Sequence, residues 1–381
     1  MRKITIILAI FLILNISTTT SADQLENLIK LLPRDIFGLI TNLVINLLRG
    51  LLGPRLPLSD AELTELTETL KELSKHGYSI SQEDLLRIAQ SVAEIATLTG
   101  GEWTAKLNLE ALLPEKVQKL RNGALNVGTN GGNEIEDEPP RDKREVGRAK
   151  RAVSCTYNIE FDARTKWPAC KSIINYVQDQ GECGSCWAHS VASCFTDLYC
   201  IDQSKNNRSI PKTPFSAYDL LSCSQPDGCN GGVVEDAWKW VEKNGICTGT
   251  DFPRKSGCKP YPFAPWNNDP KLKVKSVSTK GGEANIKEQL KKFGPVSAGF
   301  YVYEDFNAYK DGVYYNVKGK ELGGHAVVIT GYGTATCGGK KIPFWIIRNS
   351  WGPKWGKGGF FYMRRGTNEC EIEKHISYGG F

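Results

Sequence analysis

Residues 180–190 read Q-G-E-C-G-S-C-W-A-H-S, a stretch with two cysteines three residues apart, Cys183 and Cys186. The spacing alone suits a redox pair, half of a metal site, or two thiols with different functions. Cys186 opens the helical pattern W-A-H-S-V-A-S-C-F-T-D-L-Y-C, whereas Cys183 lies in the glycine-rich approach to it. Because a helix N-terminus stabilises a thiolate, Cys186 is predicted to be a nucleophile and Cys183 a disulfide half that holds the loop.

The first residues of the chain have the pattern of a secretory signal peptide. Arg2 and Lys3 precede the apolar run 4–16, and small residues follow at 20–22, which predicts a signal peptide over residues 1–22. The protein is therefore expected in the secretory pathway, and finally outside the cell or in a lysosome. Twelve cysteines in an oxidising compartment should mostly form disulfides, which weighs against a cytosolic redox pair. The net charge of +6 is too mild and dispersed to indicate a nucleic-acid partner.

Residues 23–124 contain no cysteine and show helical periodicity, and a polar linker follows them at 128–140. Two basic tetrapeptides come next, R-D-K-R at 141–144 and R-A-K-R at 148–151, a pattern cut by proprotein convertases. We therefore predict a mainly helical propeptide over 23–151 and a mature domain over 152–381, with a convertase as processing partner. The apolar stretch 36–52 is consistent with packing inside the propeptide or with a helix lying on a membrane surface.

The mature part divides again by periodicity. Residues 186–245 hold helical runs, whereas residues 296–364 alternate apolar and polar positions around glycine-rich turns. These patterns predict an α+β fold in which a helical lobe precedes a β lobe, with an active site between them.

A base for the nucleophile is sought among four histidines. His325 opens the strand pattern A-V-V-I-T-G-Y-G, and a second strand pattern, F-W-I-I-R, runs into Asn349. Folding the two as an antiparallel hairpin about Gly338-Gly339 brings His325 close to Asn349, and an imidazole beside an amide acceptor is an oriented base. The Gln180 amide is predicted to join the backbone N–H of Cys186 as a donor to an oxyanion.

Four motifs together resemble the papain-like cysteine peptidases: Q-G-E-C-G-S-C-W-A, D-G-C-N-G-G (227–232), G-G-H-A-V (323–327) and N-S-W-G-P-K-W-G (349–356). F-D-A-R-T-K-W-P-A-C (161–170) and G-C-K-P-Y-P-F (257–263) resemble cathepsin B more narrowly. The resemblance covers residues 160–381. It implies the papain-like two-lobe fold, with a helical left lobe and a β-barrel-like right lobe, and hydrolysis of peptide bonds through a thioester.

The resemblance also implies the role of each matching residue. Cys186 is the nucleophile, His325 the base, Asn349 its orienter and Gln180 the oxyanion donor. The substrate-binding residues are Gly231 and Gly232, which line the cleft, Trp351, which shields the His–Asn contact, and His375. His375 is either the floor of the pocket for the side chain before the scissile residue or a surface histidine. No metal or cofactor is required, and the implied partners are peptide substrates and cystatin-like inhibitors.

Three disulfides are implied by the resemblance: Cys170–Cys200, Cys183–Cys229 and Cys223–Cys258. The last is expected because the cathepsin B partners of both cysteines lie in an insertion that this chain lacks. Cys337–Cys370 is a further candidate. Cathepsin B releases dipeptides with a loop that carries two adjacent histidines. The chain has no histidine between His189 and His325, so an endopeptidase with little or no dipeptide release is expected. The alternative is an inactive homologue that serves as a binding module.

Overall fold

The computed structural model describes residues 44–53, 56–127, 153–225, 227–248, 271–374 and 376–381. The predicted signal peptide, the basic tetrapeptides, Cys258 and His375 lie outside these residues. The chain forms two compact units, one made of residues up to Ile95 with Lys106–Pro114, the other of Ala96–Ala105 with Glu115–Phe381. The second unit therefore includes two segments that the sequence assigns to the propeptide.

The first unit is helical, as predicted for the propeptide. Residues 44–52 are helical, and α4 (Asp60–Lys75), most of α5 (Gln82–Thr99) and α6 (Leu109–Leu112) follow. Ser59 caps α4 through a reciprocal capping box with Glu62. Of the apolar stretch 36–52, only 44–52 is described, and there Leu48 and Leu52 are buried. No helix among the described residues is long and apolar enough to cross a bilayer.

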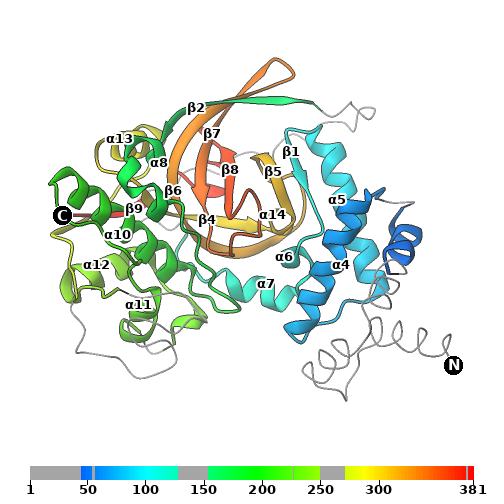
Figure 1. Cartoon of the computed structure of the whole chain (residues 1–381), viewed down its shortest axis with the longest axis horizontal. Coiled ribbons are helices and arrows are strands. Elements are labelled where there is room, and N and C mark those ends of the chain that lie inside the picture. Colours follow the sequence, from blue (N-terminus) through cyan, green and yellow to red (C-terminus); the bar gives the residue numbers. More distant parts are fainter. Residues whose placement is uncertain (1–43, 54–55, 128–152, 226, 249–270, 375) are drawn as a thin grey trace. The chain divides into compact units, whose positions relative to one another are not determined.

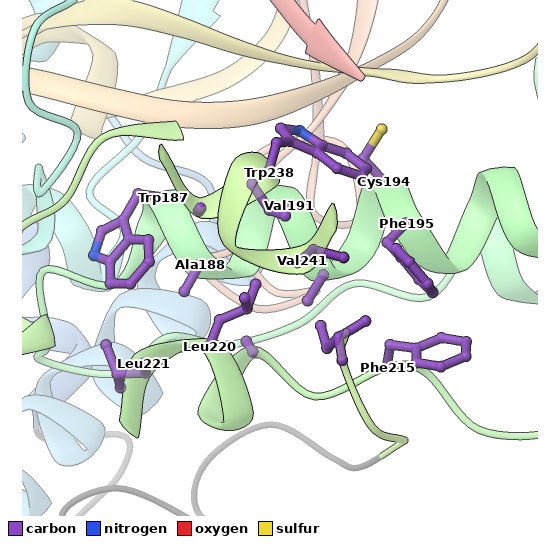
Figure 2. Close-up of a cluster of buried hydrophobic side chains, with 14 of the residues drawn as sticks. Trp187, Ala188, Val191, Cys194, Phe195, Phe215, Leu220, Leu221, Trp238 and Val241 are labelled. Atoms are coloured by element: carbon purple, nitrogen blue, oxygen red, sulfur yellow. The ribbon is translucent and has the colours of Figure 1, made fainter. Parts of the chain in front are cut away.

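The helical lobe of the second unit is built around α10 (Cys186–Lys205), against which α11 (Ala217–Cys223) and α12 (Val234–Asn244) pack. Its apolar core joins Val191 and Phe195 of α10 to Leu220 of α11 and Trp238 of α12 (Figure 2). Shorter elements surround this core: α8 (Ala163–Lys166), η1 (Pro168–Cys170), α9 (Lys171–Ile174) and η2 (Gly228–Asn230). The core holds α10 in place from its first turn onward, because Trp187 and Ala188 belong to it.

The β lobe lies beside these helices in Figure 1 and contains most of the later strands. The strand order in its sheet is β1-β5-β8-β7-β6-β4-β9-β3, and β2 pairs with β6. The strands are β1 (Trp103–Ala105), β2 (Cys155–Asp162), β3 (Ser276–Thr279), β4 (Val296–Tyr303), β5 (Tyr309–Tyr314), β6 (Glu321–Cys337), β7 (Lys340–Arg348), β8 (Phe360–Arg364) and β9 (Ile376–Gly380). The remaining elements of the unit are α7 (Glu115–Arg121), α13 (Glu283–Lys292), α14 (Glu304–Asn307) and η3 (Glu369–Glu371). A helical lobe before a β lobe confirms the predicted α+β fold.

A segment that precedes residue 128 supplies one strand to this sheet. β1 pairs antiparallel with β5, which places Trp103 opposite Gly312. The indole of Trp103 is fully buried, with ring centroids 5.1 Å from Tyr314 and 6.2 Å from Tyr309. Beside it, Glu102 forms ion pairs with Arg364 at 2.6 Å and Lys340 at 3.2 Å. This part of the predicted propeptide is thus attached to the sheet by backbone, apolar and charged contacts.

Two of the implied disulfides, Cys170–Cys200 and Cys183–Cys229, are present in the structure. The pairing of Cys337 with Cys370 is wrong, because Cys337 bonds Cys155 where β2 and β6 lie in register.

The implied Cys223–Cys258 bond involves a residue outside the described ones. Cys223 does not support it, because its sulfur donates a hydrogen bond to Asp219 Oδ1 at 3.2 Å. Cys247, to which no pairing was assigned, is disulfide-bonded.

Candidate active site

The two cysteines of the opening motif occupy different environments. Cys186 is the first residue of α10 and is completely buried. Cys183 lies before the helix and is joined to Cys229, while Gly184 N donates to the Cys229 carbonyl at 2.9 Å. On the helix side, Trp187 Nε1 donates to the Gly228 carbonyl at 3.1 Å. Loop 228–230 therefore contacts the chain both before and after Cys186. Cys186 itself lies at the helix N-terminus, where a thiolate is stabilised.

The β6–β7 hairpin brings together the histidine and the asparagine that the sequence pairs. Val328 lies opposite Arg348 across the hairpin, so Asn349 follows the end of β7 within reach of His325. His325 Nε2 lies 2.8 Å from Asn349 Oδ1, and both side chains are buried. The Trp351 ring centroid lies 4.8 Å from that of His325 and covers this contact. Because Nε2 of His325 is held by Asn349, Nδ1 is the ring nitrogen left for other contacts.

Gln180 is oriented by a residue that the sequence analysis did not single out. Ser350 Oγ donates to Gln180 Oε1 at 2.8 Å, and Gln180 N donates to the Ser350 carbonyl at 2.9 Å. This leaves the two N–H groups of Gln180 Nε2 to donate to the carbonyls of Cys183, at 2.8 Å, and Arg121, at 2.9 Å. The amide predicted to bind an oxyanion thus already holds a peptide carbonyl. Ser350 stands between Asn349 and Trp351 in the same motif, and that adjacency was the available signal.

An extended segment of the predicted propeptide lies across the site. Ala124 N donates to the Gly324 carbonyl, and Leu125 N donates to the Gly232 carbonyl, both at 3.0 Å. Gly232 N donates back to the Gly123 carbonyl at 2.8 Å, and Ala124 pairs with Gly232 in the parallel sense. The predicted cleft residue Gly232 therefore binds a peptide backbone. Segment 122–127 was not predicted from the sequence to occupy this cleft.

Glycines make this close approach possible. A Cβ on Gly123 would lie 1.9 Å from the Gly184 carbonyl oxygen, and one on Gly231 would lie 2.9 Å from the Gly123 carbonyl oxygen. Gly231 also has φ +105°, a conformation that residues with a side chain rarely adopt.

Beyond Gly123, the segment packs into an apolar cluster. Val127 and Ala124 pack with Cys186 and Ala326. Tyr301 Oη donates to the Val127 carbonyl. A Cβ on Gly324 would meet Val127 Cγ2 at 2.7 Å, so the branched Val127 side chain fits here because Gly324 has no side chain. His375, predicted as the floor of a pocket, lies outside the described residues.

Burial shifts the protonation equilibria of Cys186 and His325. Loss of solvent raises the pKa of the Cys186 thiol to about 11, although backbone groups of Ala326 and Gly123 lower it. Loss of solvent also lowers the pKa of His325 to about 3, against the Asn349 hydrogen bond that raises it, and the Arg121 charge lowers it further. The covered site therefore favours a neutral thiol and a neutral imidazole over a thiolate–imidazolium pair.

His189 lies one turn after the candidate nucleophile. It is fully buried, its Nδ1 lies 3.0 Å from the Ser185 carbonyl oxygen, and its ring packs edge-on against Tyr218 at 6.0 Å. This placement is that of a core side chain in the helical lobe. Among the described residues, no group of three or more His, Cys, Asp or Glu side chains is arranged to hold a metal ion.

Residues 157–380 match the family model described as papain family cysteine protease. Cathepsin B-like cysteine proteinase 4 of Caenorhabditis elegans is 40% identical over 262 residues, which are 59% of this chain and 75% of that protein. A cathepsin B-like cysteine proteinase of Schistosoma japonicum is 38% identical over 255 residues, 58% of this chain and 72% of that protein. The solved proCathepsin B S9 from Trypanosoma congolense superposes with a TM-score of 0.59 at 30% identity, covering 76% of this chain and 97% of that one.

Proposed function

This chain belongs to the papain family of cysteine proteases, as a cathepsin B-like member made as a proenzyme, and on that premise we propose an endopeptidase with Cys186 as its nucleophile. In this proposal His325 is the general base, Asn349 orients it, and Gln180 stabilises the oxyanion. Gly231 and Gly232 bind the substrate backbone. Trp351 shields the contact between His325 and Asn349.

The proposed reaction proceeds in two steps. The Cys186 proton passes to His325 Nδ1, and the thiolate attacks the scissile carbonyl carbon while Gln180 Nε2 and the Cys186 N–H bind the oxyanion. The C–N bond then breaks as His325 returns the proton to the leaving amine, which leaves a thioester. Water, deprotonated by His325, hydrolyses the thioester and regenerates the thiol.

One observation carries this proposal: the site already holds a peptide in extended form. Gly232 exchanges backbone hydrogen bonds with Gly123 and Leu125, and Gln180 Nε2 donates to the Arg121 carbonyl at 2.9 Å. A polypeptide bound in this way beside a thiol, an imidazole and an amide donor is what an acyl-transfer site for peptides requires.

The same contacts indicate how the proregion inhibits the enzyme and why it must be removed. Segment 122–127 covers Cys186 in the proenzyme, so activity requires its displacement. We propose that a proprotein convertase cuts after Arg144 or Arg151 in the secretory pathway, and that the mature chain acts outside the cell or in a lysosome. Cystatin-like inhibitors are proposed to enter the open cleft.

The competing function is that of an inactive homologue that binds peptides without turnover. Labelling of the processed chain with an epoxide thiol probe, together with peptide hydrolysis, distinguishes the two functions. We expect Cys186→Ala to abolish both labelling and hydrolysis, and His325→Ala to reduce hydrolysis by at least 10³-fold. Cys194→Ala, which alters another buried thiol on α10, is the matched control and should retain labelling. Retained labelling in Cys186→Ala would refute the assignment.

We propose little or no dipeptide release, because the chain has no histidine between His189 and His325 to anchor a substrate carboxylate. The stretch 249–270, where such a loop would be inserted, lies outside the described residues. A pair of internally quenched peptides, one with a free C-terminus and one amidated, tests the proposal. Similar rates are expected, whereas a strong preference for the free acid with dipeptide products would contradict it.

A further inference from the structure

A charged side chain is buried beside the proposed catalytic pair. Arg121 is the last residue of α7 and is only 6% exposed. Its guanidinium carbon lies 5.0 Å from the centroid of the Trp351 ring. Arginine is rarely buried without compensation, and a guanidinium over an indole face is one of the contacts that provides it. The Trp351 surface therefore binds a cation in the proenzyme.

The position of this cation relative to the scissile bond follows from the chemistry. His325 protonates the leaving amine, so the substrate residues after the scissile bond must extend on the His325 side of Cys186. Trp351 lies on that side, with its ring 4.8 Å from that of His325. Gly232, whose carbonyl accepts a hydrogen bond from Leu125 N, binds the residues on the other side of the scissile bond. The Arg121 contact thus marks the leaving-group side of the cleft.

The surroundings of Trp351 suit a cation more than a neutral group. Its ring is held by Trp355 at 5.1 Å and Phe306 at 5.5 Å, so the indole is fixed before a ligand arrives. An isolated strand bridge sets the backbones of Trp351 and Asp179 side by side, and the side chains of Asp179 and Glu182 are exposed in that loop. Negative charge at the rim of an aromatic site raises the local concentration of cations.

We propose that Trp351, Asp179 and Glu182 form a subsite for a cationic side chain on the leaving-group side of the cleft. The processed enzyme therefore prefers arginine or lysine within the first two residues after the scissile bond. This rests on the proposed peptidase function and adds the class of substrate side chain that this side of the cleft selects. In the proenzyme, the Arg121 guanidinium lies against the Trp351 ring of this subsite.

Matched internally quenched peptides test the preference in the processed enzyme. They carry arginine, its neutral isostere citrulline, or alanine at each of the two positions after the cleaved bond. We expect kcat/KM for arginine to exceed that for citrulline by about 3- to 10-fold at one of the positions, as a partly desolvated cation–π contact provides. The double change Asp179→Asn and Glu182→Gln should reduce this ratio, as should high salt. Asp236→Asn on α12, an exposed carboxylate elsewhere, should leave it unchanged.

A binding measurement keeps the subsite testable whatever the turnover. Fluorescent peptides spanning residues 115–127, with arginine or citrulline at position 121, are titrated into the processed Cys186→Ala chain. Tighter binding of the arginine peptide supports the subsite. Equal binding of the two peptides, or equal hydrolysis of the arginine and citrulline substrates, overturns it. Absence of hydrolysis for every substrate would instead overturn the proposed function, and the binding comparison would still decide the subsite.

Discussion

At the scale of single residues, burial in the proenzyme favours the neutral forms of Cys186 and His325. Burial raises the pKa of Cys186 to about 11 and lowers that of His325 to about 3, so the thiolate–imidazolium pair is unfavourable while segment 122–127 covers them. Removal of the segment returns water to both groups. Desolvation then no longer opposes the charged forms, and the two pKa values move towards each other.

This predicts a pH-dependent difference in the alkylation of Cys186. In the unprocessed chain, iodoacetamide should modify Cys186 slowly even at alkaline pH, because the thiol is buried and its pKa is raised to about 11. In the processed chain the modification should reach half its maximum at a pH several units lower. Mass spectrometry of the peptide that contains Cys186 measures this directly. Buried Cys194 in the same digest is the control and should change little on processing. Equal pH midpoints for Cys186 in both forms would contradict the prediction.

At the scale of elements, the extended segment 122–127 passes the proposed nucleophile Cys186. Residue 123 of this segment is a glycine. Gly123 faces Gly184, and a Cβ on Gly123 would lie 1.9 Å from the Gly184 carbonyl oxygen. Backbone atoms cannot move away from such a contact as a flexible side chain can. The segment can therefore approach Gly184 this closely because residue 123 is glycine.

Gly123→Val should consequently weaken the attachment of the proregion. We expect the unprocessed variant to hydrolyse a small peptide substrate at least 10-fold faster than the unprocessed wild type, since the strand must leave the site. Activity is measured on chain shown by gel electrophoresis to be full length. Gly50→Ala is the matched control, because a Cβ there meets nothing within 4 Å. Unchanged inhibition in Gly123→Val would show that other contacts alone hold the segment.

At the scale of the whole molecule, a disulfide secures the start of the peptidase domain. Cys155 at the first position of β2 bonds Cys337 at the end of β6, which closes a loop with a sequence separation of 182 residues. Both basic tetrapeptides precede Cys155 in the sequence. A cut after Arg151 would leave three residues before the disulfide, so the new N-terminal strand stays bonded to the β6–β7 hairpin.

We therefore expect mass spectrometry of the mature chain to find Glu145 or Ala152 as its first residue. Arg151→Ala should shift processing towards Glu145, and Arg144→Ala should shift it towards Ala152. The double variant should accumulate at full length. A mature N-terminus between residues 44 and 121 would refute convertase processing at these sites.

Much of the fold was predictable because its signals are local. A helix that starts at Cys186 and a hairpin about Gly338-Gly339 follow from apolar periodicity and turn residues within a few positions of each other. Once the hairpin is formed, the proximity of His325 and Asn349 requires no other part of the chain. The order of lobes follows in the same way, since helical and strand periodicities occupy separate stretches.

The chain by itself thus determined the two lobes and the pairing of His325 with Asn349. Only the tertiary structure decided which distant segments meet: Cys155 with Cys337, Arg121 with Trp351, and Gly123 with Gly184. A glycine in a polar stretch has the same local signature whether it forms a turn or lies flat against another backbone. Contacts between residues far apart in sequence depend on the path of all the chain between them, and no short-range periodicity records that path.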